Sequence, residues 1–173
     1  TKISDVYKFA EKEIPIMFFD CICNFKKYIS KSKTQNKKNI LRTYPRNKTD
    51  GKVEWNKNMM QIDRLIRASG TPFFGAYTYL GNVKLFLIEY DMLKPSFDFN
   101  AEYGQVVGRN KDGSVSVACK DGFIIIKKIR FQNKIYSKPS QVITSIYMKL
   151  GMNIEEEIEK INNKLDKILE KIK

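Results

Sequence analysis

The chain has 173 residues, enough for one domain with appended helices. Hydrophobic residues make up 42% of it, including 11 Phe and 9 Tyr, which excludes an intrinsically disordered chain. The net charge of +13 predicts an anionic partner such as RNA or a nucleotide diphosphate.

Two further classes are excluded by what the sequence lacks. No apolar run approaches the roughly 20 residues of a membrane-spanning helix, so we expect no membrane partner. The cysteines, Cys21, Cys23 and Cys119, show no metal-binding spacing, and we expect neither a metal site nor a disulfide. An odd, unpatterned set of cysteines is typical of a reducing compartment, which predicts a cytoplasmic location.

Residues 1–30 are predicted to form a helix that Ser4 caps and Pro15 kinks near Glu11. Its apolar face is too wide and too aromatic for an isolated surface helix. We therefore expect this face to pack against a partner, and packing on the rest of the same chain is the alternative. The face consists of Val6, Phe9, Ala10, Ile14, Met17, Phe18, Cys21, Ile22, Phe25 and Tyr28.

Residues 31–52 are predicted to be a basic linker, because Lys31 to Thr49 contains seven Lys or Arg residues and no acid. A solvated linker without a ligand is the alternative to an anion-binding segment. Within it, alternation along an extended backbone puts Arg42, Tyr44 and Arg46 on one side. Two guanidinium groups beside an aromatic ring suit a diphosphate and a stacked base. The alternative is that Arg46 and Lys48 only hold this strap to the domain.

Residues 53–150 are predicted to form one domain that begins with a helix at Asn58–Ser69. Asn56 is the expected N-cap, and Gly70 lies near the C-terminal cap. We expect Trp55 in the core, together with Phe73 and Phe74, for which a nucleotide pocket is the alternative. The buried face of the helix is predicted to consist of Met59, Ile62, Leu65 and Ile66.

Strand patterns separated by glycine turns follow, and residues 93–103 are expected to form a long loop. Alternation of Val115 and Val117 with Ser114 and Ser116 predicts one buried and one solvated face. The fold class is therefore predicted to be α+β, with a small antiparallel OB-like β-barrel and flanking helices. The strands are expected at Ala76–Leu80, Val83–Tyr90, Gln105–Arg109, Ser114–Cys119 and Phe123–Phe131.

Two helices are predicted after the strands. The first is Pro139–Leu150, and the second starts at Asn153 within residues 151–173, where Glu156 completes a capping box. Apolar residues in the second helix alternate by four and three, which indicates a heptad seam and predicts a homo-oligomer, with a dimer favoured. The alternative is an amphipathic helix lying on its own domain. The seam is Ile154, Ile158, Ile161, Leu165, Ile168 and Ile172.

Several short motifs occur together between Arg42 and Gly151. They are Tyr44-Pro45-Arg46, Asp50-Gly51-Lys52-Val53-Glu54-Trp55, Arg64-Leu65-Ile66-Arg67-Ala68, Pro72-Phe73-Phe74-Gly75-Ala76-Tyr77-Thr78-Tyr79, Gly104-Gln105-Val106-Val107, Asp112-Gly113-Ser114-Val115, Asp121-Gly122, Pro139-Ser140-Gln141-Val142-Ile143 and Lys149-Leu150-Gly151. As a set they resemble the C-terminal domain of the formyltransferase family, whose members transfer a formyl group from formyltetrahydrofolate to an amine.

Two branches of the family, which act on different substrates, are compatible with the resemblance. Methionyl-tRNA formyltransferases usually carry an Asn-Pro-Trp-Pro run where this chain has Ser69-Gly70-Thr71-Pro72-Phe73-Phe74. That departure and the Arg-x-Tyr-Pro-Arg strap look more like the enzymes that formylate a nucleotide-linked amino sugar. We therefore expect the sugar branch of the family, and the alternative is a domain that binds initiator tRNA.

The resemblance also implies where the chemistry lies. The family's Asn, His and Asp triad belongs to an N-terminal domain, whereas this chain has no histidine. We expect this chain to be the inactive tail of a longer transferase, with residues 1–30 as the last helix of the catalytic domain, which would be its partner. Formyltetrahydrofolate would be bound by that domain and not by this chain. We expect no catalytic or metal-binding residue here. The candidate substrate-binding residues are Arg42, Tyr44, Arg46 and Arg67.

Overall fold

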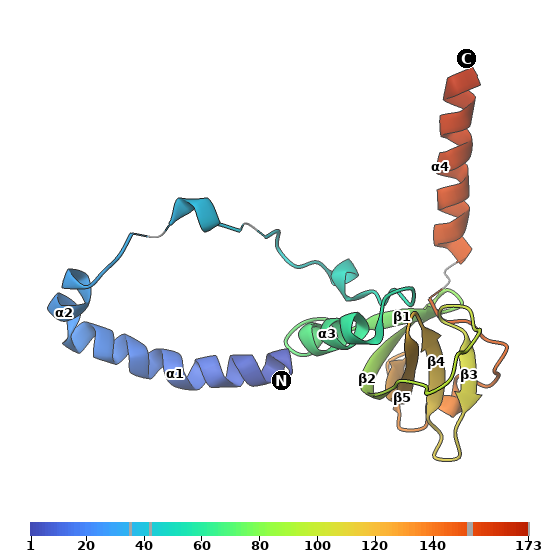
Figure 1. Ribbon diagram of the computed structural model, residues 1–173, viewed down its shortest axis with the longest axis horizontal. Helices are drawn as coiled ribbons and strands as arrows, with labels where there is room; N and C mark the ends of the chain where they lie inside the picture. Colours follow the sequence, from blue (N-terminus) through green and yellow to red (C-terminus); the bar gives the residue numbers. More distant parts are fainter. Residues whose placement is uncertain (35, 42, 152–153, 173) are drawn as a thin grey trace.

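The computed structural model describes residues 1–34, 36–41, 43–151 and 154–172. Within these residues, six strands form one curled antiparallel sheet in the order β1-β2-β5-β4-β3, with β6 paired to β5 (Figure 1). This arrangement with flanking helices confirms the predicted fold class. The strands are β1 (Tyr77–Leu80), β2 (Val83–Leu93), β3 (Val106–Arg109), β4 (Val115–Cys119), β5 (Gly122–Phe131) and β6 (Lys134–Tyr136).

A short segment, residues 148–151, connects the two edges of the curled sheet. The backbone N–H of Leu150 donates to the carbonyl of Gly104, beside β3, at 2.8 Å. One residue later, the N–H of Gly151 donates to the carbonyl of Tyr79 in β1, also at 2.8 Å. The barrel-like shape therefore results from this segment, because the strand order places β1 and β3 at opposite edges.

The predicted helix at Pro139–Leu150 is wrong. A single turn of 3-10 helix, Pro139–Gln141, forms there, and the chain then continues without regular helix to Lys149, which makes an isolated β-bridge with Gln105. Residues 142–146 are rich in β-branched side chains, which disfavour a helix. The backbone groups near Leu150 are used by distant strands, so they are not available for helical hydrogen bonds.

The helix α3 (Met59–Ser69) is capped by Asn58 and not by the expected Asn56. The side-chain oxygen of Asn58 accepts from the Gln61 N–H at 2.8 Å, and the Gln61 side chain accepts from the Asn58 N–H at 3.2 Å. This reciprocal pair is a capping box. Gly70 is the C-cap, as predicted.

The hydrophobic core joins α3 to the strands. Met59, Ile62 and Ile66 are buried as predicted, and Leu65 packs against the core while half-buried. Trp55 is 4% exposed and its Nε1–H donates to Thr78 Oγ1 at 2.9 Å, which confirms its predicted core position. The buried strand residues of this core are Leu85, Leu87, Val106, Val115, Val117, Cys119, Ile124, Ile126 and Ile129.

The predicted solvated face of β4 is wrong, because all of its residues are buried. Ser116 is 9% exposed, and Ser114, just before the strand, is 3% exposed. The Asn110 side-chain amide donates to both hydroxyls, at 2.8 Å to Ser114 and 3.2 Å to Ser116. Burial is tolerated because these polar groups are hydrogen-bonded to each other.

The strand β6 was not predicted from the sequence. The turn that leads into it holds Gln132 and Asn133, both with positive φ, at 47° and 64°. Two consecutive residues with positive φ are typical of the tight hairpin turn that fits the twist of paired strands. The turn contains no glycine, the residue that marked the other hairpins in the sequence.

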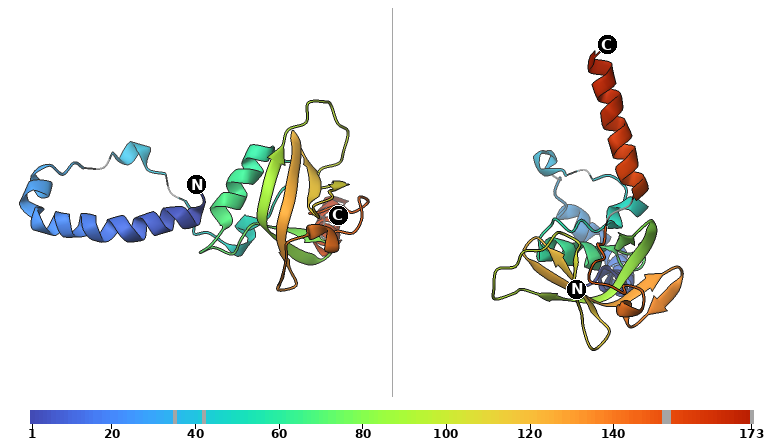
Figure 2. Two further views of the ribbon diagram at one scale, coloured as in Figure 1. Left: turned by 90° about the horizontal axis from the view of Figure 1, so that it is seen from below. Right: turned by 90° about the vertical axis from the view of Figure 1, so that its right-hand side faces the viewer.

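Residues 1–30 form α1 (Ile3–Cys23) and α2 (Phe25–Ser30), which meet at Asn24. Lys2 is the N-cap in place of the predicted Ser4, and its backbone N–H donates to the Asp5 carboxylate at 2.8 Å. The helix α1 runs on through Pro15. Figures 1 and 2 show its first turns near α3 and the remainder extending away from the sheet.

The helix α4 (Ile154–Ile172) also extends away from the sheet, as both figures show. It therefore does not adopt the alternative of lying on its own domain. The predicted N-cap of this helix, Asn153, falls outside the described residues. Among the helices of the described residues, none is long and apolar enough to cross a membrane.

Candidate functional site

Five cationic side chains lie over aromatic rings on the outer surface of the sheet and its preceding corner, and we name this surface the cationic–aromatic face. The distances from the charged group to the ring centre lie between 4.3 and 5.2 Å. Such contacts are attractive because the ring face carries negative partial charge. The pairs are Arg46 over Phe73, Lys48 over Phe74, Lys52 over Tyr79, Lys84 over Tyr77 and Arg130 over Phe86.

Strand register explains why the sheet part of this face assembles. Tyr77 pairs with Phe86 across β1 and β2, and Tyr79 pairs with Lys84. Phe86 pairs in turn with Arg130 across β2 and β5. Directly paired residues project from the same side of a sheet, so these five side chains share one side.

The basic strap supplies the remaining cations because it is fastened beside β1. Lys52 forms a parallel β-bridge with Tyr77, and the Val53 N–H donates to the Tyr77 carbonyl at 2.7 Å. Gly51 is buried there, and a Cβ at this position would lie 2.5 Å from the Gly75 carbonyl oxygen. The Asp50-Gly51 turn therefore needs a glycine for close approach of the two backbones.

A hollow of about 770 Å³ adjoins the cationic–aromatic face, between the first turns of α1 and the outer side of β2. Its lining includes the cations Lys2, Lys8, Arg67 and Arg130 and contains no acidic residue. It also includes Phe73 and Phe74. Phe74 is 51% exposed, so the predicted core position is wrong for it and the pocket alternative is the better description. A concave surface with this excess of positive charge attracts polyanions.

Arg67, one of the predicted site residues, is held by a polar network at the edge of this hollow. Its guanidinium donates to one oxygen of the buried Asp63 carboxylate, at 2.7 Å from Nη2 and 2.9 Å from Nε. The hydroxyl of Tyr90 donates to the other oxygen at 2.7 Å. Burial raises the pKa of Asp63, but the bonds from Arg67 and Tyr90 outweigh it, so this pKa is lowered overall. Burial and the Asp63 carboxylate raise the pKa of Tyr90.

Tyr44 and Arg46, the predicted site residues of the strap that the structure describes, do not converge as a diphosphate clamp. Arg42 falls outside the described residues. Tyr44 is 73% exposed, and its hydroxyl lies 3.5 Å from an Asp50 oxygen. Arg46 points to a different place, where its Nη2 donates to Ser69 Oγ at 2.7 Å. In the described part of the strap, Arg46 and Lys48 thus contact the rings of the corner, and whether they also bind an anion stays a prediction.

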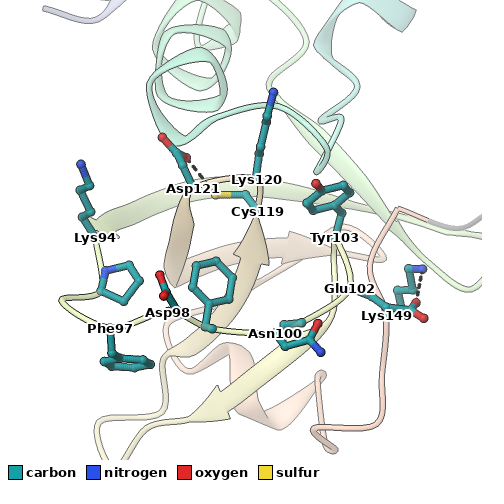
Figure 3. Close-up of a pocket in the computed structure, with 13 residues that line it drawn as sticks. Lys94, Phe97, Asp98, Asn100, Glu102, Tyr103, Cys119, Lys120, Asp121 and Lys149 are labelled. Atoms are coloured by element: carbon teal, nitrogen blue, oxygen red, sulfur yellow. Dashed lines mark hydrogen bonds and ion pairs between the residues drawn. The ribbon is translucent and has the colours of Figure 1, made fainter.

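A second, larger hollow of about 920 Å³ lies under the loop that follows β2 (Figure 3). Its charges are balanced, because its lining contains three lysines and three acidic residues: Lys94, Lys120, Lys149, Asp98, Glu102 and Asp121. Lys149 Nζ lies 2.6 Å from Glu102 Oε2. Burial raises the pKa of the Cys119 thiol in its wall, which disfavours the reactive thiolate. This hollow therefore has less electrostatic attraction for an anion than the first one.

Sequence reasoning missed Lys52, Lys84 and Arg130. Lys52 and Lys84 are single cations between uncharged neighbours, and Arg130 follows Lys127 and Lys128, from which the sequence does not distinguish it. One signal in the sequence could have revealed Lys84. The Gly81-Asn82 turn fixes the register of the hairpin, and this register places Lys84 opposite Tyr79 and Phe86 opposite Tyr77. Arg130 could not be found in this way, because its pairing with Phe86 depends on the register between β2 and the more distant strand β5.

Residues 46–146, more than half of the chain, match the family described as Formyl transferase, C-terminal domain. A methionyl-tRNA formyltransferase of Treponema denticola is 25% identical over 128 residues, which are 72% of this chain and 39% of that protein. The one of Clostridium beijerinckii is 33% identical over 106 residues, 61% of this chain and 31% of that protein. The chain thus spans two fifths or less of the length of these curated relatives.

Among solved structures, a variant of HypX from Aquifex aeolicus is similar, with a TM-score of 0.48 and 16% identity. The similarity covers 75% of this chain and 23% of HypX.

Proposed function

Because the chain belongs to the formyl transferase C-terminal domain family, we propose that it is the RNA-binding part of a methionyl-tRNA formyltransferase. In this proposal the cationic–aromatic face and the adjoining hollow bind the phosphate backbone of a tRNA. The activity of the whole protein would be transfer of a formyl group to the amine of methionyl-tRNA. This chain would supply binding and orientation and no catalytic group.

The observation that carries the proposal is the set of five cations held on rings beside a hollow without acidic residues. A cation above a ring covers that ring, so the face offers charge to a ligand and few open ring surfaces for stacking. Charge of this kind suits phosphates, which position an RNA without reading its sequence. Double-stranded RNA is recognised mainly by such shape and backbone contacts.

The sugar branch expected from the sequence has less support. The relatives reported above are methionyl-tRNA formyltransferases, which favours the tRNA alternative. The strap, on which the sugar interpretation depended, uses Arg46 for contacts with Ser69 and Phe73. A nucleotide diphosphate needs a few convergent donors, whereas the observed cations are spread along the sheet and the strap.

Formyltetrahydrofolate is the formyl donor that the family implies, and the residues of this chain do not fit a transfer site for it. The chain has no histidine that could act as a general acid or base near neutral pH. The buried carboxylate Asp63 is occupied by Arg67 and Tyr90, and Asp121 accepts from the Met59 N–H at 2.7 Å. We therefore derive no step of formyl transfer from these residues and assign the donor to a separate catalytic domain.

The apolar face of α1 is proposed to contact that catalytic domain. Phe9 and Phe18 of this face are each 66% exposed, although phenylalanine is normally buried. A large exposed apolar face of this kind marks an interaction surface. The first turns of α1 remain on the sheet domain, since Tyr7 and Phe73 have ring centres 6.2 Å apart. The helix would thus connect the RNA-binding face to the catalytic domain.

The proposal is tested by titrating the full 173-residue chain with an initiator tRNA transcript over a series of salt concentrations. The logarithm of the affinity should fall linearly with the logarithm of the salt concentration, with a slope of about −0.9 per neutralised phosphate. If each of the five cations of the face neutralises one phosphate, together they account for a slope of about −4.5. Replacing Lys84 and Arg130 by Ala should weaken binding and bring the slope closer to zero by about 2.

The matched control is Lys94→Ala with Lys120→Ala, which removes the same charge from the loop hollow. This variant should keep the affinity and the slope. Equal losses in both variants would mean that net charge, and not this face, determines binding. Saturable binding of a uridine-diphosphate amino sugar, with no salt-dependent affinity for tRNA, would overturn the proposal in favour of the sugar branch.

A further inference from the structure

The seam of α4 is exposed along the described part of the helix. Its residues project from one side, and each is 51% to 55% exposed. The helix meets the sheet domain at its first turn, where the Ile154 N–H lies 3.3 Å from Asn82 Oδ1. The side chains in question are Ile154, Ile158, Ile161, Leu165 and Ile168.

This seam needs a partner for physical reasons. A helix of 19 residues that packs on nothing lacks its main source of stability, because most helical stability in proteins comes from packing of an amphipathic face. A strict spacing of four and three is the narrow pattern of a coiled coil, whereas a helix on a globular core has a wider face. The structure shows the helix leaving its own domain, so the domain does not cover the seam.

The charge along α4 indicates which partner fits. Residues 154–160 contain four glutamates and one lysine, whereas residues 161–173 contain four lysines and two acids. A second copy running parallel would place acidic half beside acidic half and basic half beside basic half. A second copy running antiparallel would place each acidic half beside a basic half, which is the attractive arrangement.

We infer that α4 pairs with α4 of a second copy in antiparallel orientation. With the seam in register, Ile158 lies opposite Ile168 of the second copy, and Ile161 lies opposite Leu165 of the second copy. The midpoint of the pair falls at Asn163, between the layer of Ile161 and the layer of Leu165. Isoleucine at both core positions favours higher assemblies in parallel coiled coils, but antiparallel pairing is set by the charge pattern.

The position of the sheet domain is compatible with this orientation. The domain lies at the Ile154 end of α4, as Figures 1 and 2 show. An antiparallel pair therefore places the two sheet domains at opposite ends of a rod about 28 Å long, given a rise of about 1.5 Å per residue. The seam contains no residue of the cationic–aromatic face, so the inference depends on other observations than the proposed function does.

Cysteine cross-linking distinguishes the orientations. The exposed Cys21 and Cys23 are first replaced by Ser in the full chain, and buried Cys119 is kept. Ile158→Cys and Ile168→Cys are then made separately, and one variant carries a size tag. Under mild oxidation each variant should stay uncross-linked, and an equal mixture should give the mixed disulfide. These positions are about 15 Å apart along a helix, too far to link in a parallel pair.

Light scattering on the full chain provides a second, independent readout. Ile161→Asp introduces a charge into the seam and should halve the measured mass at concentrations where the unmodified chain is a dimer. Asn163→Asp introduces the same charge on the opposite side of the helix and should leave the dimer intact. A disulfide within the Ile158→Cys variant by itself would overturn the antiparallel orientation. An unchanged mass in Ile161→Asp, with no cross-link in the mixture, would overturn pairing through α4.

Discussion

The guanidinium of Arg46 lies 4.9 Å from the centre of the Phe73 ring. The same group donates a hydrogen bond to the buried Ser69 hydroxyl, so it connects the basic strap to the end of α3 and to the following corner. This residue therefore has two roles to separate, one in stability and one in binding.

Arg46→Ala is expected to lower the free energy of unfolding by about 1–2 kcal/mol, from loss of the hydrogen bond and the ring contact. Lys48→Ala is the matched control, because Lys48 contributes the same charge and a ring contact at 5.1 Å to Phe74. Its cost should be about 0.5 kcal/mol or less. Urea unfolding measures both values. If Arg46→Ala unfolds like the unmodified chain but binds tRNA more weakly, Arg46 acts on the ligand and not on the fold.

The segment that closes the sheet can be tested at Gly104, which has φ of 83°. A Cβ there would lie 2.2 Å from the Leu150 carbonyl oxygen, so Gly104→Ala should destabilise the domain by about 3 kcal/mol or more. Gly81→Ala is the control, since Gly81 has φ of 58° and no atom within 4 Å of an added Cβ. That change should cost about 1 kcal/mol, from backbone strain. Similar melting temperatures for the two variants would contradict the proposed closure.

Asp63 predicts a pH dependence of stability. Its folded-state pKa lies below the ordinary 3.8, because Arg67 and Tyr90 outweigh the effect of burial. The stabilisation is therefore fully present above about pH 4 and is lost as the pH falls through the folded-state pKa. Asp63→Asn should melt lower than the unmodified chain at neutral pH, and the difference should shrink towards acid. As a control, Asn in place of the exposed Asp98 should shift the melting temperature little. A difference that stays constant with pH would refute the role of the Asp63 charge.

The exposed face of α1 makes a further prediction for the isolated chain. It should increase the fluorescence of a hydrophobic dye such as ANS, because large side chains including Phe18 and Phe19 are exposed. A variant consisting of residues 31–173 should bind much less dye and should still unfold cooperatively, since the core residues lie within residues 53–150. Loss of cooperative unfolding would show that α1 is a part of the domain core.

Much of the local structure could be predicted from sequence. The buried residues of α3 and the hairpin turns at Gly81 and Gly113 follow from periodicity and turn chemistry. The N-cap of α3 was predicted at Asn56, but the structure has it at Asn58. Both asparagines precede the same helix, and only the first hydrogen bonds of the helix distinguish them. The α+β class and the long loop before β3 follow from the same local signals.

The errors share a different cause. Ser114 and Ser116 look solvated in an alternating strand, but Asn110 bonds both hydroxyls and allows their burial. Residues 139–150 have mixed periodicity, and their conformation depends on hydrogen bonds to strands far away in the chain. The hairpin of β6 has a turn without glycine, so its residues carry no strong turn signal.

By itself, the sequence determined the family resemblance, the class of fold, the positive charge and the heptad seam of α4, because each follows from residue types and their spacing along the chain, without knowledge of which distant segments meet. The tertiary structure decided which cations form a surface. Arg130 on β5 reaches Phe86 on β2 only through strand register, and Lys52 is placed by a bridge to Tyr77. The candidate site thus depends on pairings between distant segments, and such pairings are set by the packing of the whole domain and not by local propensity.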